Sequence, residues 1–151
     1  MTAAAKRPYL IIWCAWLLHA AAWFLPVMAG EVAFPRWLPG WEAFRAAFCY
    51  VWPYEGLSMD VWYHTALATT SALSTILFLL GSPLVVMQRS RWMLSLAAWI
   101  ASLAFVVNAH WYVLYRIRVG LRIGYFFWWL SFLLLAVGLV GLAGQRKSGR
   151  I

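Results

Sequence analysis

Four long stretches of uncharged, mostly apolar residues alternate along the chain with shorter polar or basic segments. They cover residues 8–30, 61–88, 92–115 and 123–145. Each exceeds the roughly 20 residues with which an α-helix crosses the hydrocarbon core of a bilayer. Within lipid the backbone polar groups must bond to one another, which favours helices. The pattern therefore predicts four transmembrane helices, at about residues 8–29, 61–87, 92–115 and 122–144.

The lengths of the connections indicate how these helices are arranged. Residues 88–91 and 116–122 form short connections, and helices joined by short connections are usually antiparallel neighbours. The first connection, residues 30–60, is much longer. We therefore predict an all-α fold: a single transmembrane domain over residues 1–151, built as a four-helix up-down bundle with a long first outer loop.

A second periodicity lies inside the long loop. The apolar residues that recur there at helical spacing are Trp41, Phe44, Phe48 and Val51. Glu42 and Arg45 fall on the opposite side, and Gly40 and Pro53 bound the segment. This pattern predicts an amphipathic helix that lies flat at the outer membrane interface. If a partner protein covers this helix, the expected partner-binding residues are Trp41, Phe44, Phe48 and Trp52.

Small and hydroxylated residues gather in two of the spans. The outer half of the second span contains Thr65, Ala68, Thr69, Thr70, Ser71, Ala72, Ser74 and Thr75. The fourth span ends with Gly138, Gly141 and Gly144. Such residues let helices approach closely, either within the bundle or against a neighbouring membrane protein. In addition, Gly81-Ser82-Pro83 predicts a bend or an end of regular helix near the inner side.

The composition and the charge pattern agree with a membrane protein. Hydrophobic residues make up 66% of the 151 residues and charged residues 11%, against roughly 25% charged in soluble domains. The net charge of +8 comes from basic residues that flank the apolar stretches, which indicates topology and lipid headgroups rather than nucleic acid.

The distribution of charge also predicts an orientation. With the N-terminus in the cytoplasm, seven basic residues lie inside and five outside, and all four acidic residues lie outside. We therefore expect a multi-pass protein of the cell membrane with both termini cytoplasmic. The outer arginines Arg116, Arg118 and Arg122 are expected to pair with acidic residues of the long loop.

Three histidines are the candidate cofactor ligands of the spans. His64 and His110 are predicted near the outer ends of the second and third helices, and His19 near the middle of the first. An ionisable residue at membrane depth is a candidate functional group, and Asp60 precedes His64 by one turn and could orient its ring. The histidines could ligate the iron of haem or the magnesium of chlorophyll. The alternative, with no cofactor bound, is that they form structural hydrogen bonds.

The sequence offers little for catalysis or for a metal centre. It has no paired carboxylates in the spans, no H-E-x-x-H motif, no phosphate-binding glycine loop and no C-x-x-C pair. We therefore predict no catalytic residues and no enzymatic activity.

The leading hypothesis is a small non-enzymatic integral membrane protein, an accessory or assembly subunit that packs against a larger membrane complex. Its expected partners are membrane lipids and other membrane subunits, and not nucleic acid. Two alternatives stay open: a membrane protein that binds haem or chlorophyll through His64, His110 and His19, and a small carrier or channel.

Overall fold

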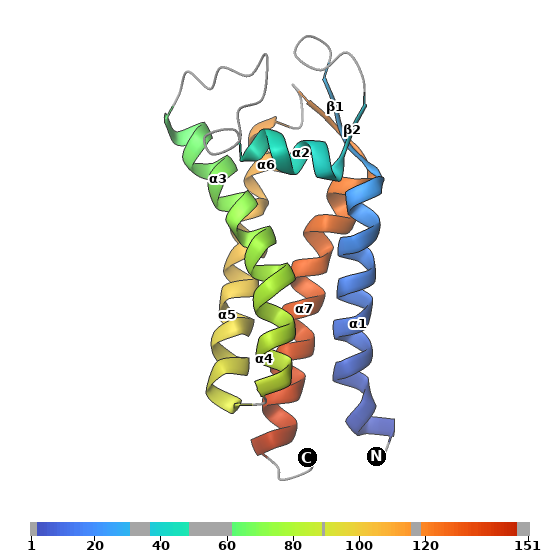
Figure 1. The fold of residues 1–151 in the computed structure, drawn as a ribbon, viewed down its shortest axis with the longest axis vertical. Coiled ribbons are helices and arrows are strands. Elements are labelled where there is room, and N and C mark those ends of the chain that lie inside the picture. Colours follow the sequence, from blue (N-terminus) through green and yellow to red (C-terminus); the bar gives the residue numbers. More distant parts are fainter. Residues whose placement is uncertain (1–2, 31–36, 49–61, 89, 116–118, 148–151) are drawn as a thin grey trace.

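The computed structural model describes residues 3–30, 37–48, 62–88, 90–115 and 119–147. Its elements, in order, are α1 (Ala3–Phe24), β1 (Pro26–Gly30), β2 (Trp37–Pro39), α2 (Gly40–Ala47), α3 (Trp62–Ile76), the π-helical turn η1 (Leu77–Gly81), α4 (Ser82–Gln88), α5 (Arg91–Asn108), α6 (His110–Tyr115), β3 (Val119–Leu121) and α7 (Ile123–Lys147). Figure 1 shows four upright rods, formed by α1, by α3 with η1 and α4, by α5 with α6, and by α7.

The two ends of the bundle differ. Both chain termini lie at one end, which we call the terminal end (Figure 1). At the other end, the cap end, α2 and the three strands cover the rods, and we call these elements the cap. Most of the described chain is helical, as the sequence predicts.

The last helix, α7, is the central element of the bundle. It packs along α1 on one side and along α5 on the other. A Cβ atom added at Gly138 would lie 2.5 Å from Cγ1 of Ile12, and one added at Gly141 would lie 3.1 Å from Cγ of Pro8. Two of the three predicted glycines therefore allow the close approach of α1, whereas the space beside Gly144 is open.

Three helical segments are long and apolar enough to cross a membrane: Thr65–Gln88, Arg91–Val113 and Ile123–Arg146. The first helix, α1, is not among them. It ends at Phe24 instead of continuing to residue 29, because Pro26 has no N–H to donate and disfavours helical backbone at Leu25. Its uncharged part, residues 8–24, is about 25 Å long at 1.5 Å per residue. For three of the four predicted spans, the structure thus has a helix that is long and apolar enough to cross a membrane.

The prediction of a purely α-helical fold is wrong at the cap end. There β1 pairs with β2 and with β3 in a small antiparallel sheet of order β2-β1-β3. Met28 lies opposite Leu38 on one side and Leu121 on the other. The sheet forms because the chain leaves helical geometry at Pro26, and the backbone groups of the connections then need partners. The Arg122 amide continues this pattern and donates to the Val27 carbonyl at 2.9 Å.

The second rod departs from α-helical geometry in its middle. Residues Leu77–Gly81 form a π-helical turn directly before the Ser82-Pro83 pair, where the sequence predicts a bend. Pro83 cannot donate to the carbonyl one turn earlier and its ring would clash with it, so a wider turn relieves the conflict. The Ser82 hydroxyl donates to the Phe78 carbonyl at 2.6 Å. The rod therefore stays continuous through the proline.

Candidate functional site

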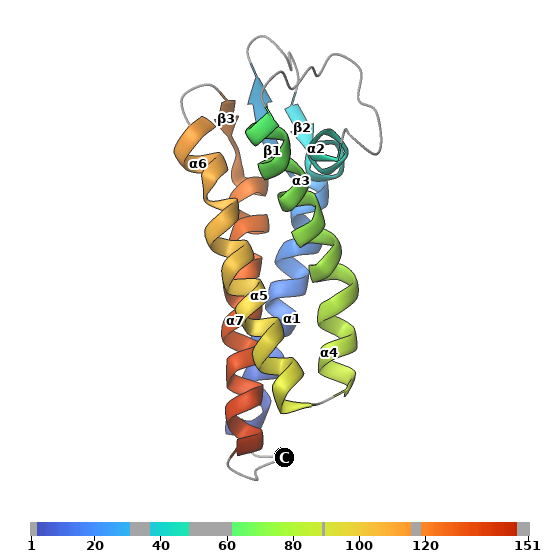
Figure 2. The same cartoon turned by 90° about the vertical axis from the view of Figure 1, so that its left-hand side faces the viewer.

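A cavity of about 60 Å³ lies beneath α2 at the cap end. Helix α2 crosses the ends of the rods in Figure 1 and is seen along its own axis in Figure 2. The volume corresponds to about two water molecules, at roughly 30 Å³ each. Sites for larger organic ligands usually measure about 300–1,000 Å³. In this conformation the cavity cannot hold a tetrapyrrole.

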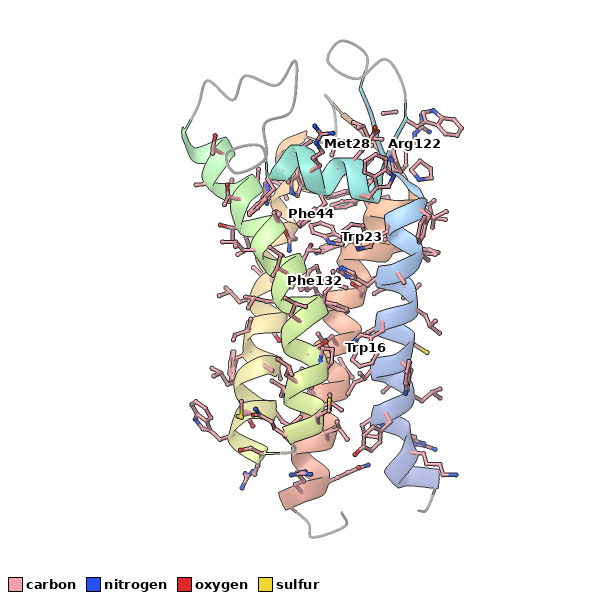
Figure 3. The ribbon with its side chains drawn as sticks, viewed as in Figure 1. Trp16, Trp23, Met28, Phe44, Arg122 and Phe132 are labelled. Atoms are coloured by element: carbon pink, nitrogen blue, oxygen red, sulfur yellow. The ribbon has the colours of Figure 1, made fainter. Side chains whose placement is uncertain are left out.

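The roof of the cavity is held to the first helix by aromatic packing and by a glycine. Phe44 points from α2 toward Trp23 (Figure 3), with ring centroids 5.4 Å apart, and its other neighbour is Phe48 at 5.9 Å. At Gly40 any Cβ atom would overlap the backbone carbonyl of Ala22. Only glycine therefore allows α2 to begin so close to the end of α1.

The sequence predicts that Glu42 lies on the polar side of this short helix, with Trp41 on the apolar side. This prediction is wrong for Glu42. Glu42 is buried, with 9% of its surface exposed, whereas Trp41 is 45% exposed. Helix α2 faces the cavity with Gly40, Ala43, Phe44 and Ala47, and Trp41 lies on its exposed side.

The predicted partner-binding residues therefore divide. Trp41 is exposed, Phe44 packs on Trp23 inside the molecule, and Phe48 is half-buried beside it. Trp52, like residues 49–61 in general, is outside the described residues. Of the segment predicted as an amphipathic helix, the structure describes a helix over Gly40–Ala47, and its placement at a membrane interface remains a prediction.

The floor of the cavity is a set of indole–hydroxyl hydrogen bonds. Trp111 Nε1 donates to Ser71 Oγ at 3.0 Å, and Trp128 Nε1 donates to Thr75 Oγ1 at 3.0 Å. The two acceptors lie one turn apart on α3. An indole N–H that is removed from water needs an acceptor, and these hydroxyls provide it. The hydroxylated face of the second span is therefore used within the bundle.

Asn108 links three rods beside this floor. It is fully buried; its side-chain Nδ2 donates to Ser74 Oγ at 3.0 Å, and its carbonyl accepts from the Tyr125 hydroxyl at 3.0 Å. Its Oδ1 has no hydrogen-bond partner among the described residues. Asn108 thus ties α5 to α3 through its side-chain amide and to α7 through its backbone carbonyl.

His19 lies one turn deeper, in a layer between α1, η1 and α7. It is fully buried, and its Nδ1 is 2.9 Å from Ser131 Oγ. The Ser131 hydroxyl donates its hydrogen bond to the Trp128 carbonyl at 2.6 Å, so it acts as the acceptor for the N–H of His19 Nδ1. The ring stacks on Phe78 at 4.0 Å and meets the edge of Phe132 at 5.7 Å. His19 Nε2 has no partner in the described part of the chain.

The histidines predicted as ligands do not form one site. His19 is completely enclosed by side chains, so no haem-sized ring can reach its Nε2 in this conformation. His110 lies at the start of α6, after the turn at Ala109, with Nδ1 2.7 Å from the Val107 carbonyl. The side chain of His64 and the whole of Asp60 are outside the described residues, so the predicted pair of His64 with His110 remains a prediction.

Among residues 3–30, 37–48, 62–88, 90–115 and 119–147, no group of three or more His, Cys, Asp or Glu side chains is arranged to hold a metal ion. Cys14 is an exposed free thiol. Arg116, Arg118 and most of the loop acids are outside the described residues, so the predicted ion pairs of the outer face remain predictions.

Comparisons with protein families, with curated proteins and with solved structures gave no match. The candidate site is therefore characterised by its own geometry.

Sequence reasoning missed the residues that pair within this site, chiefly Trp111, Trp128, Tyr125 and Asn108. A signal for them was present. Buried indole N–H groups need acceptors, and the hydroxyls of Ser71, Ser74 and Thr75 recur on one side of α3. Which indole meets which hydroxyl depends on the rotation of the rods, and the sequence does not specify this rotation.

Proposed function

We propose that the protein is a non-enzymatic integral membrane protein that acts as an accessory or assembly subunit of a larger membrane complex. In this proposal all four rods cross the membrane, and the basic terminal end lies in the cytoplasm. The cap then lies on the outer side. The following observations support it.

The outer surfaces of all four rods are apolar. Large exposed side chains include Leu17 on α1, Leu80 on η1, Leu103 on α5 and Val140 on α7. In water such a surface would be an aggregation hazard, whereas in a bilayer it meets lipid or another helix. For α1, β1 extends the chain beyond Phe24, and the long side chains of Lys6 and Arg7 can reach the headgroup level. A fourth crossing is therefore physically reasonable despite the short helix.

The observation that carries the subunit role is the position of the exposed tryptophans of the cap. Trp37 of β2 is 68% exposed and Trp41 of α2 is 45% exposed, and only Leu38, Pro39 and Gly40 separate them. Exposed aromatic side chains on a rigid support are typical anchors of protein interfaces. The hydroxyls of α3 and two glycines of α7 are already used inside the bundle. The cap tryptophans are thus the surface that we assign to a partner.

Affinity purification of the full chain in a mild detergent tests this function. We expect other membrane subunits to co-purify with the unchanged protein and to be lost from the double variant Trp37→Ala with Trp41→Ala. Trp13→Ala is the matched control, because Trp13 is 58% exposed but lies on α1 away from the cap. A protein that is monomeric and alone in every mild detergent would contradict the proposal.

Tetrapyrrole binding is the second candidate function, and one observation favours it. The hydrogen bond from His110 Nδ1 to the Val107 carbonyl fixes the tautomer in which Nε2 can act as a ligand. Visible absorption of the purified protein tests it: a bound ring gives a Soret band that His110→Ala abolishes. Because His19 is enclosed, a folded His19→Phe variant is expected to keep the band. A colourless protein, also after incubation with haem, would exclude this function.

A further inference from the structure

A long groove runs between α5 and α7 in the terminal half of the bundle. Its volume is about 440 Å³, in the range of sites that hold organic ligands. The α5 side is formed mainly by Arg91, Ser95, Ala98, Trp99 and Ser102, and the α7 side by Val140, Ala143 and Gly144. It is separate from the cavity beneath α2, with which it shares no lining residue.

The groove exists because both helices carry small residues at positions where larger side chains would fill the space between them. A Cβ atom added at Gly144 would meet no atom within 4 Å, and Ala98 and Ala143 project only methyl groups. The hydroxyl of Ser102 donates to the carbonyl of Ala98 at 2.9 Å, so its hydrogen is directed to its own helix. The floor is therefore largely apolar, and Trp99, which is 76% exposed, forms one wall.

The length of the groove matches one leaflet of a bilayer. Arg91 is the first residue of α5, and Ser102 lies eleven residues further, about 16 Å along the axis at 1.5 Å per residue. This is close to half of the roughly 30 Å hydrocarbon core. A chain that enters at the level of Arg91 would end near the middle of the membrane.

The charge at the mouth of the groove is positive. Arg91 is exposed there, and Lys6, Arg7 and Arg146 lie at the same terminal end of the bundle. All four acidic residues of the sequence lie between residues 31 and 60, in the connection that carries the cap. A guanidinium at headgroup depth favours a phosphate group, and clusters of basic residues at the end of transmembrane helices attract anionic lipids.

We propose that this groove binds an anionic phospholipid of the cytoplasmic leaflet. One acyl chain lies between α5 and α7 along Ala98, Trp99 and Gly144, and the headgroup phosphate accepts hydrogen bonds from Arg91. The proposal depends on the membrane orientation given under the proposed function, but not on the existence of a protein partner. It assigns the groove to a lipid that is held specifically.

A second copy of the chain is a less suitable occupant. Copies inserted in the same orientation would bring their basic terminal ends to the same depth, where like charges repel. An anionic headgroup removes this repulsion instead of adding to it. Charge complementarity therefore favours the lipid.

Native mass spectrometry of the full chain in detergent tests the proposal, with phosphatidylglycerol and phosphatidylcholine as probes. We expect one molecule of phosphatidylglycerol to be retained in preference to phosphatidylcholine. Arg91→Gln should reduce this preference about five-fold, the effect of one basic residue near the membrane surface. Arg7→Gln is the matched control, because Arg7 is an exposed arginine of the same end on a different rod, and it should reduce the preference by less than two-fold.

Gly144→Leu should abolish retention of either lipid by filling the groove. The space beside Gly144 is open and leucine favours helix, so this variant is expected to fold. Val137→Leu, at an exposed position of the same helix outside the groove, should bind lipid normally. Addition of phosphatidylglycerol should raise the melting temperature of the unchanged protein and of Val137→Leu, but not of Gly144→Leu. Should Gly144→Leu fail to fold, Ser95→Leu narrows the same groove from the α5 side at a half-buried position.

Equal lipid retention by Gly144→Leu and the unchanged protein would overturn the proposal, as would an equal loss in Arg7→Gln and Arg91→Gln. A cross-linked dimer that Gly144→Leu removes would overturn it in favour of a second copy. The proposed function is tested separately on the unchanged protein. Its failure would appear as extraction from membranes by carbonate or as the absence of co-purified subunits, whichever lipid the groove holds.

Discussion

The cap half and the terminal half of the bundle are held together in different ways. Near the cap, side chains of different rods are joined by hydrogen bonds, as in Trp128 to Thr75 and Asn108 to Ser74. In the terminal half the main contacts are apolar and depend on shape, as where Ile12 meets Gly138. Trp16 to Ser82 is a hydrogen bond that lies below the His19 layer. Directed polar pairs therefore predominate in the cap half, and close packing that leaves a groove predominates in the terminal half, where Trp16 and Ser82 add one polar pair.

This difference has a physical basis. In lipid, apolar helices gain little from meeting each other through the hydrophobic effect, so close packing and hydrogen bonds must provide the specificity. Hydrogen bonds fix the rotation of each rod, whereas glycine contacts fix the distance between rods. Hydrogen bonds between rods predominate near the cap, although Gly40 also allows a close contact there, and close packing predominates in the terminal half.

The largest effect is expected from filling the closest contact of the terminal half. Gly138→Leu would force α1 away from α7, because even a Cβ atom would lie 2.5 Å from Ile12 Cγ1. We expect a loss of about 3 kcal/mol, measured by unfolding in mixed detergent micelles. Gly144→Leu, six residues further on the same helix, has open space and should change stability little in the absence of lipid. Equal losses in both variants would show that the glycine contact is not what holds α1.

The second-largest loss of stability is expected at His19, which lies at the boundary between the two halves. His19→Ala would leave a hole between Phe78 and Phe132, and we expect a loss of about 2 kcal/mol in the same unfolding measurement. His19→Phe should cost less than about 1 kcal/mol, because the new ring fills the space and Ser131 keeps its bond to the Trp128 carbonyl. If His19→Phe proved as damaging as His19→Ala, the imidazole itself would have a role beyond packing.

A smaller loss of stability is expected when one of the polar pairs of the cap half is removed. Trp128→Phe removes the donor to Thr75 Oγ1, and we expect a loss of about 1 kcal/mol, typical of a hydrogen bond between transmembrane helices. A double-mutant cycle with Thr75→Val measures the coupling directly. The control is Trp99→Phe, at an exposed indole of the terminal half. A coupling energy near zero would contradict the role given to this pair.

The smallest effect is expected for a hydroxyl that bonds only to its own helix. Ser102→Ala removes a bond to the Ala98 carbonyl and should change the free energy of unfolding by less than about 0.5 kcal/mol. Ser71→Ala, which removes the acceptor of Trp111, should cost more. If Ser102→Ala cost more stability than Ser71→Ala, hydrogen bonds between rods would not be what holds the cap half together.

The sequence predicts those features that depend on one segment at a time. The long uncharged stretches give the rods, and the departure from α-helix before Pro83 follows from its own residues, as does the suitability of Gly138 for a close helix contact. The features that depend on two distant segments are missed. The strand at Pro26–Gly30 has no alternation that separates it from the preceding helix, and β3 has only three residues.

The same reason explains what could be predicted of the candidate site. His19 and the hydroxyls of α3 stand out in the sequence as polar groups within long apolar stretches. That His19 meets Ser131, 112 positions away, depends on how α1 and α7 are rotated against each other. The burial of Glu42 likewise follows from how α2 docks on the rods, and not from its own periodicity.

The π-helical turn at Leu77–Gly81 has a consequence for sequence change in this rod. A π turn contains one residue more than the α turn it replaces. With this extra residue, the buried side chains of α3 before the turn and of α4 after it point toward the same side of the rod. Deleting one residue elsewhere in the rod would rotate everything beyond it by about 100°. Deleting Leu79 in a Pro83→Ala background, which removes the clash of the proline ring, would instead shorten the wide turn to an ordinary one, and Thr75 and Ser82 would keep their directions. This position is therefore where the rod can lose a residue with least disturbance to the partners on either side.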